Sequence, residues 1–177
     1  MYATAGDDLH FCDPERINGP AGCELGWVMV NVPGEFTADA IAEAMDRGDY
    51  YATTGVGVEE IDFDRASGTL HVRAQTEPGV NYRVEFITTK RDFDRSIVER
   101  EYPDEGKFTR ILPVINDTIG KVVSTVDGPE ASYTLCDDDL YVRAIVKSDR
   151  PGKIDSRFYP ATECAWTQPV TNESSSR

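Results

Sequence analysis

The fold of this chain is decided by the stretch Val58-Glu59-Glu60-Ile61-Asp62-Phe63-Asp64, Arg65-Ala66-Ser67-Gly68, Thr69-Leu70-His71-Val72-Arg73-Ala74-Gln75. Two segments that alternate with a period of two flank a turn of small polar residues, which is the pattern of a β-hairpin. Leu70, Val72 and Ala74 fall on one face of the second strand, so we predict that this face lies in a core. His71 falls on the opposite face, where a solvated strand histidine is expected.

The chain after this hairpin repeats the strand pattern several times. We predict further strands at residues 82–88, 109–115, 122–126, 131–135 and 140–147, separated by Pro, Gly and Asp turns. Residues 90–108 are charged and irregular, so a long exposed connection is expected there. Several short strands without an intervening helix indicate an antiparallel β-sandwich or jelly-roll-like module. The predicted fold class is therefore α+β and mostly β, with a disordered polar tail at residues 171–177.

The chain before the hairpin has a different pattern. Residues 26–32 form a continuous apolar run, which suits a strand buried on both faces, as in a parallel sheet. Thr37 is a candidate N-cap for a helix over residues 38–47, and Gly48 stands where that helix should stop. A strand followed by a helix is half of a βα unit, and it cannot bury both faces of its strand alone. A partner domain, a second copy or a missing barrel must cover it.

Composition excludes two classes of partner. The chain has 177 residues with 18 basic against 32 acidic side chains, a net charge of −14. Such a surface repels phosphate backbones, so no nucleic-acid partner is expected. There is no run of about 18 apolar residues and no basic segment followed by an apolar one at the amino terminus. No membrane partner is expected, and the predicted location is cytoplasmic.

The four cysteines, at positions 12, 23, 136 and 164, contain no Cys-x-x-Cys pair. Free thiols in a reducing compartment are therefore expected. Cys136 and Cys164 stand beside apolar strand-like sequence, so we predict that both are small core residues. A contribution of Cys12 or Cys23 to a metal site stays open.

Two carboxylates and an imidazole follow the amino terminus, in Asp7-Asp8-Leu9-His10. The i, i+2 spacing of Asp8 and His10 puts both side chains on the same face of a strand. A carboxylate oxygen and a neutral imidazole nitrogen suit zinc, manganese or iron, but two ligands make only part of a site. The alternative is a solvated Asp-rich turn with a surface histidine.

The chain resembles the C-terminal part of PHP (polymerase and histidinol phosphatase) family proteins in four segments, residues 7–10, 26–30, 47–55 and 163–170. In that family an Asp-x-His element late in a distorted barrel supplies ligands to a metal cluster that hydrolyses phosphate esters. The resemblance implies that Asp8 and His10 are metal ligands and that Asp7 orients a ligand or replaces one. It also implies that residues 1–55 are the C-terminal remnant of a PHP-type barrel, followed by a β-sandwich module over residues 56–170.

The segment Tyr50-Tyr51-Ala52-Thr53-Thr54-Gly55 follows the predicted helix and belongs to this resemblance. Two interpretations of it stay open. The aromatic residues can simply pack at the helix end. Alternatively, Tyr50, Thr53 and Thr54 line the site.

Several ligands of the family's metal cluster have no counterpart in this chain. Its opening His-x-His element is absent, as are its middle histidine and acidic ligands, and the chain has only two histidines. We therefore predict the C-terminal portion of a PHP-like metal-dependent phosphoesterase that is inactive as an isolated chain. Its cofactor would be a divalent metal, bound only if other residues complete the site. The alternative is a non-catalytic β-sandwich module for binding or oligomerisation, and the expected partners are the missing barrel portion or a second copy.

Overall fold

The hairpin predicted over residues 58–75 is confirmed by the computed structural model, which describes residues 2–6, 25–103, 109–115, 117–152 and 161–172. It consists of β3 (Val58–Asp64) and β4 (Thr69–Ala74). Strand β9 (Glu130–Thr134) pairs with β4 and completes a three-stranded antiparallel sheet. His71 is half-buried on the outer face of this sheet, where its Nδ1 lies 2.9 Å from Ser132 Oγ.

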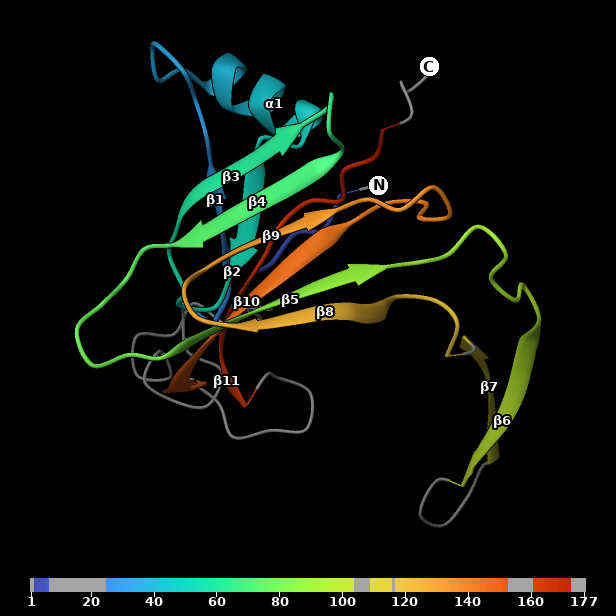
Figure 1. Cartoon of the computed structure of the whole chain (residues 1–177). Helices are drawn as coiled ribbons and strands as arrows, with labels where there is room; N and C mark the ends of the chain where they lie inside the picture. The colour runs from blue at the N-terminus through green and yellow to red at the C-terminus, as the bar shows by residue number, and fades with distance from the viewer. Residues whose placement is uncertain (1, 7–24, 104–108, 116, 153–160, 173–177) are drawn as a thin grey trace, which may run out of the picture.

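A second, larger sheet lies against the inner face of the first one (Figure 1). Its six strands are all antiparallel and follow the order β1-β2-β11-β10-β5-β8. They are β1 (Trp27–Val30), β2 (Tyr50–Thr53), β5 (Tyr82–Thr88), β8 (Lys121–Asp127), β10 (Arg143–Pro151) and β11 (Thr162–Trp166). The predicted mostly-β, antiparallel fold is therefore confirmed.

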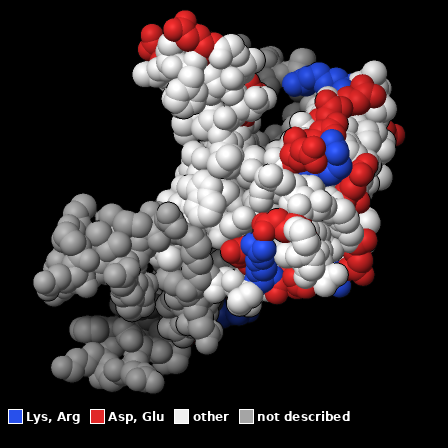
Figure 2. Space-filling model, turned by 90° about the vertical axis from the view of Figure 1, so that its left-hand side faces the viewer, with Lys and Arg blue, Asp and Glu red and all other residues white. Residues whose placement is uncertain are grey.

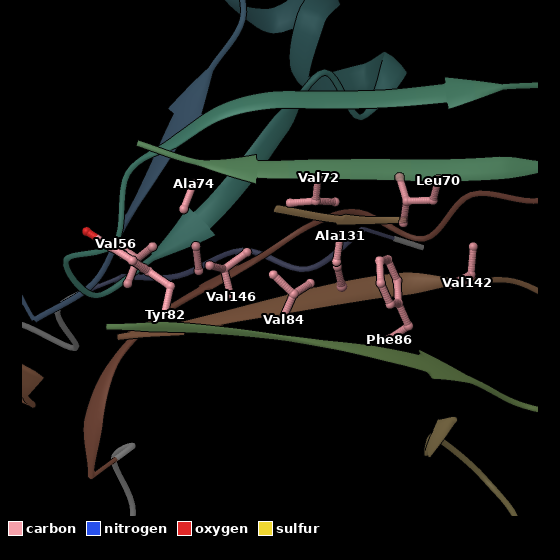
Figure 3. Packing of buried hydrophobic residues seen from close by; sticks show 12 residues of the cluster. Val56, Leu70, Val72, Ala74, Tyr82, Val84, Phe86, Ala131, Val142 and Val146 are labelled. Carbon is pink, nitrogen blue, oxygen red and sulfur yellow. The ribbon is translucent and has the colours of Figure 1, made fainter. Parts of the chain in front are cut away.

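One hydrophobic core fills the space between the two sheets (Figure 3). Leu70 and Val72 of β4 face Val84 and Phe86 of β5, and all four are 0% exposed. Leu70, Val72 and Val84 alternate with exposed or half-buried neighbours, as period-two strands require when one face is buried. The Phe86 ring also stacks on the ring of Tyr133 from the opposite sheet, with centroids 5.6 Å apart.

Helix α1 (Ala38–Arg47) begins and ends where its sequence predicts. The Thr37 hydroxyl oxygen accepts a hydrogen bond from the Ala40 N–H at 3.1 Å, as an N-cap does. Gly48 follows with φ 81°, the left-handed conformation of a helix C-cap, and its N–H donates to the Met45 carbonyl at 3.0 Å. No helix in the described part of the chain is long and apolar enough to cross a membrane.

Strand β1 differs from the prediction for residues 26–32. It lies at the edge of the six-stranded sheet, antiparallel to β2, and its Met29 is 48% exposed. The prediction of a strand buried on both faces of a parallel sheet is therefore wrong. A continuous apolar run reports hydrophobicity but does not reveal how many strands lie beside it. Strand β2 pairs with β11, so the first two strands share a sheet with the C-terminal strand. The boundary at residue 55 between a barrel remnant and a β-sandwich module stays a prediction.

A two-stranded hairpin, which we call the arm, projects from the sandwich (Figure 1). It consists of β6 (Ile97–Pro103) and β7 (Thr109–Ile115), which pair with each other and with no other strand that the structure describes. Strand β6 falls within residues 90–108, so the predicted irregular connection is wrong for residues 97–103. Its consecutive charges, Glu99, Arg100 and Glu101, conceal the strand because they interrupt the usual apolar alternation.

Candidate functional site

An open groove of about 1070 Å³ lies on the face of the six-stranded sheet that turns away from the core. Val142 and Ala144 point into the core with 0% exposure, so Arg143 between them points to this outer face. Ala52 and Trp166, paired across β2 and β11, also line the groove. The other lining residues are Tyr2, Ala3, Thr4, Ala5, Gly6, Leu25, Gly26, Thr54, Tyr141, Pro169, Val170 and Thr171. The volume suits a small organic ligand.

The amino-terminal residues 2–6 are held against the sandwich as part of this lining. Gln168 forms two reciprocal hydrogen bonds with Ala3: its Oε1 accepts from the Ala3 N–H at 2.8 Å, and its Nε2 donates to the Ala3 carbonyl at 2.8 Å. The Tyr2 hydroxyl donates to the Arg47 carbonyl at 2.9 Å. A Cβ on Gly48 would lie 2.5 Å from Tyr2 Cε1. The glycine that ends the helix therefore also leaves room for the Tyr2 ring.

Arg143 carries the only positive charge among the described residues that line the groove. Its side chain is half-buried and makes no hydrogen bond or ion pair with the described residues. Carboxylate partners lie within 4.0 Å of six other cations: Arg47, Arg73, Arg83, Lys90, Lys147 and Arg150. On the face shown in Figure 2, the larger blue groups likewise lie against red ones. Although acidic residues are in excess, the Arg143 guanidinium stays available for an anion.

Of the residues that the sequence suggested as a site, the structure describes Tyr50, Thr53 and Thr54. Asp7, Asp8 and His10 lie outside the described residues. Thr54 lines the groove, and its hydroxyl oxygen accepts a hydrogen bond from the Cys164 N–H at 3.0 Å.

Tyr50 and Thr53 do not belong to the described lining of the groove. Thr53 is 1% exposed and its hydroxyl lies 2.7 Å from the Val56 carbonyl oxygen, to which it donates. Tyr50 is 7% exposed, and its ring and the Tyr2 ring pack edge to face with centroids 6.3 Å apart. Burial raises the Tyr50 pKa, and the neighbouring Tyr2 adds to the effect. Thr53 therefore donates a hydrogen bond to a backbone carbonyl, and Tyr50 packs against a neighbouring ring.

A second polar cluster surrounds the buried Asp139 at the root of the arm. Its Oδ2 accepts hydrogen bonds from the Tyr133 hydroxyl at 2.9 Å and from the Cys136 N–H at 2.8 Å. Its Oδ1 makes no hydrogen bond but lies 2.8 Å from Lys90 Nζ, with which it forms an ion pair. Burial is the largest influence on the Asp139 pKa and raises it, yet Lys90, the Cys136 N–H and Tyr133 together hold this pKa below its usual range.

The same cluster has the residue types of a metal site but not its charge balance. Ligand atoms of Cys136, Asp138 and Asp139 lie within 4.8 Å of one another. However, Lys90 Nζ is 2.8 Å from an oxygen of each aspartate, so an ammonium group already serves as their cation. As it stands, the cluster does not fit a metal ion. Cys136 is exposed, so its prediction as a core residue is wrong, whereas Cys164 is buried as predicted.

Comparisons with known proteins identify no relative of this chain. No family model matches the chain, and no curated protein or solved structure is similar enough to be matched to it. The function therefore has to be inferred from the groove and from the sequence. The alternation over residues 140–147 could have placed Arg143 opposite the core face, but it could not have revealed the groove.

Proposed function

We propose that this chain is the C-terminal portion of a PHP-like, metal-dependent phosphoesterase, and that its groove binds the phosphate group of the substrate. The observation that supports this proposal is Arg143, a half-buried residue without an ion-pair partner among the described residues, in a groove of ligand size. A guanidinium binds phosphate oxygens through two parallel hydrogen bonds, and the bond is strengthened where water is partly excluded. The aromatic ring of Trp166 supplies apolar surface for the organic part of an ester.

Two residues that line the groove are close in sequence to the segment that contains the Asp-x-His element. Gly6 and Leu25, which flank residues 7–24 in the sequence, both line the groove. Asp8 follows Gly6 by only two residues, a span of at most about 7 Å. A zinc, manganese or iron ion held by Asp8 and His10, with Asp7 in support, would lower the pKa of a bound water and neutralise phosphate charge. The chain would act beside the missing barrel portion, and a cytoplasmic location is part of this proposal.

A second candidate function is binding without chemistry. None of the described residues that line the groove is Asp, Glu, His or Cys. The described lining therefore offers no carboxylate or imidazole general base and no carboxylate, imidazole or thiolate ligand for a metal. This composition favours a non-catalytic β-sandwich module that holds an anionic ligand through Arg143.

Replacing Arg143 by methionine is expected to weaken the binding of phenyl phosphate by about 10- to 100-fold, because a hydrogen-bonded ion pair is lost. Binding is measured by NMR titration of the full chain, and Arg143→Lys should retain an intermediate affinity because it keeps the charge but not the fork geometry. The matched control is Lys121→Met, which removes an exposed lysine from β8, outside the groove. Unchanged affinity in Arg143→Met would contradict the proposed anion site, as would an equal loss in Lys121→Met.

Metal content distinguishes the two candidate functions. We expect chelator-free protein to contain zinc, manganese or iron that is lost in the Asp8→Ala/His10→Ala variant, because two of the ligands are removed. Elemental analysis of both proteins tests this, followed by assays with p-nitrophenyl phosphate. If neither protein holds metal while phenyl phosphate still binds through Arg143, the phosphoesterase proposal fails and the non-catalytic binding module remains.

A further inference from the structure

The arm exposes large aliphatic side chains on both of its faces. Ile97 and Val98 are 70% and 55% exposed, and Ile111 and Leu112 are 57% and 46% exposed. Alternation along the paired strands places Ile97 and Ile111 on one face, and Val98 and Leu112 on the other. An uncovered two-stranded hairpin is marginally stable in water, and exposed apolar patches commonly mark interaction sites. The arm therefore has the composition of a surface that another protein covers.

Contacts at its root hold the chain on both sides of the arm against the sandwich. The Gly120 N–H donates a hydrogen bond to Thr89 Oγ1 at 3.0 Å. The Arg91 N–H donates to the Asp138 carbonyl at 2.8 Å, and Lys90 beside it pairs with the Asp138 carboxylate. An arm whose two ends are already held loses less conformational entropy when it binds.

The arm is also a part of the chain without excess charge. The two strands of the arm, residues 97–103 and 109–115, have a formal net charge of zero, whereas the whole chain carries −14. Their charged residues are Arg100 and Arg110 against Glu99 and Glu101. Two copies of this acidic protein therefore repel each other least when they approach through their arms.

We propose that the arm associates with the arm of a second copy of this chain. Glu99 and Glu101 lie on the face of Ile97, whereas Arg100 lies on the face of Leu112. The acidic face of one arm packs on the basic face of the next, so that opposite charges meet around buried aliphatic side chains. Because two different faces meet, the contact is heterologous and continues into a ring or a longer assembly.

Sedimentation velocity of the full chain at increasing concentration tests this association. The wild-type protein is expected to have a mass above the 19.6 kDa of one chain. Ile97→Ser/Leu112→Ser should weaken association by about tenfold or more, because both apolar faces lose their largest contacts. Phe36→Ser is the matched control, since this side chain is 79% exposed and lies outside the arm. Thermal unfolding followed by circular dichroism checks that all variants fold.

Charge exchange within the arm tests which faces meet. Arg100→Glu should weaken association, whereas Glu99→Arg/Arg100→Glu/Glu101→Arg should recover part of it, because the exchanged charges at positions 99, 100 and 101 again meet opposite charges on the facing arm. A wild-type chain that is monomeric at every concentration overturns the proposal and leaves the arm to a different partner. Association that survives Ile97→Ser/Leu112→Ser, or that Arg100→Glu does not weaken, overturns it as well.

Discussion

Replacing Asp139 by alanine is expected to lower the free energy of unfolding by about 2–6 kcal/mol, because two hydrogen-bond donors lose a buried acceptor at about 1–3 kcal/mol each. The Asp139 side chain is fully buried and accepts hydrogen bonds from the Tyr133 hydroxyl and the Cys136 N–H. Without it, both donors lose their acceptor in a place that water does not reach easily. Lys90 also loses the carboxylate with which its electrostatic interaction is least screened by solvent.

Urea denaturation of wild type and variant measures this loss. The control is Asp138→Ala, because Asp138 pairs with the same Lys90 ammonium at the same 2.8 Å but its side chain is 61% exposed. An exposed pair of this kind is worth at most about 1 kcal/mol. Equal losses in the two variants would contradict the view that burial of Asp139, and not its charge alone, stabilises the root of the arm.

The stabilising effect of Asp139 should depend on pH. Because its pKa is lower in the folded protein than the ordinary value of about 3.9, the contribution is complete above that value. It is lost as the pH falls through the folded-state pKa, when the carboxylate takes up a proton. The difference in unfolding free energy between wild type and Asp139→Asn should therefore shrink at acidic pH. A difference that stays constant on acidification would contradict this expectation.

Local sequence signals sufficed for the elements whose boundaries are set locally. Thr37 and Gly48 define α1 because a cap needs only its own turn of backbone. The β3–β4 hairpin is equally predictable, since the alternation of Leu70 and Val72 and the turn between the strands are contiguous in sequence. No comparable local signal reports the neighbours of a strand, and so the apolar run of residues 26–32 predicts the wrong kind of sheet for β1.

The candidate site depends on contacts between distant parts of the chain. The groove exists because residues 2–6 are held by Gln168, 165 positions away from Ala3. Asp139 is part of a run of three aspartates that resembles a solvated turn, and it is buried because Lys90 and Tyr133 converge on it. Alternation could place Arg143 on an outer face, but its lack of a partner among the described residues depends on where every carboxylate lies. These features depend on tertiary contacts, which the local patterns of a single sequence do not predict.

Replacing Phe86 by alanine is expected to lower the free energy of unfolding by about 3–5 kcal/mol, because it leaves a cavity between the two sheets. Phe86 is 0% exposed and its ring stacks on that of Tyr133 across the core. Phe86→Leu keeps most of the volume and should cost less than the alanine variant. Urea denaturation measures both, and equal losses in the two variants would show that the cavity is not the cause.

Phe86 and Asp139 should also be energetically coupled, although neither is a hydrogen-bond partner of the other. Both contact Tyr133, whose ring packs on Phe86 and whose hydroxyl donates to Asp139. Once Phe86→Ala releases the ring, the hydroxyl is held less firmly, so removing Asp139 should then cost less. The double variant Phe86→Ala/Asp139→Ala is therefore expected to lose about 0.5–3 kcal/mol less than the sum of the single losses. Strict additivity would contradict the role of Tyr133 as the link between the core and the root of the arm.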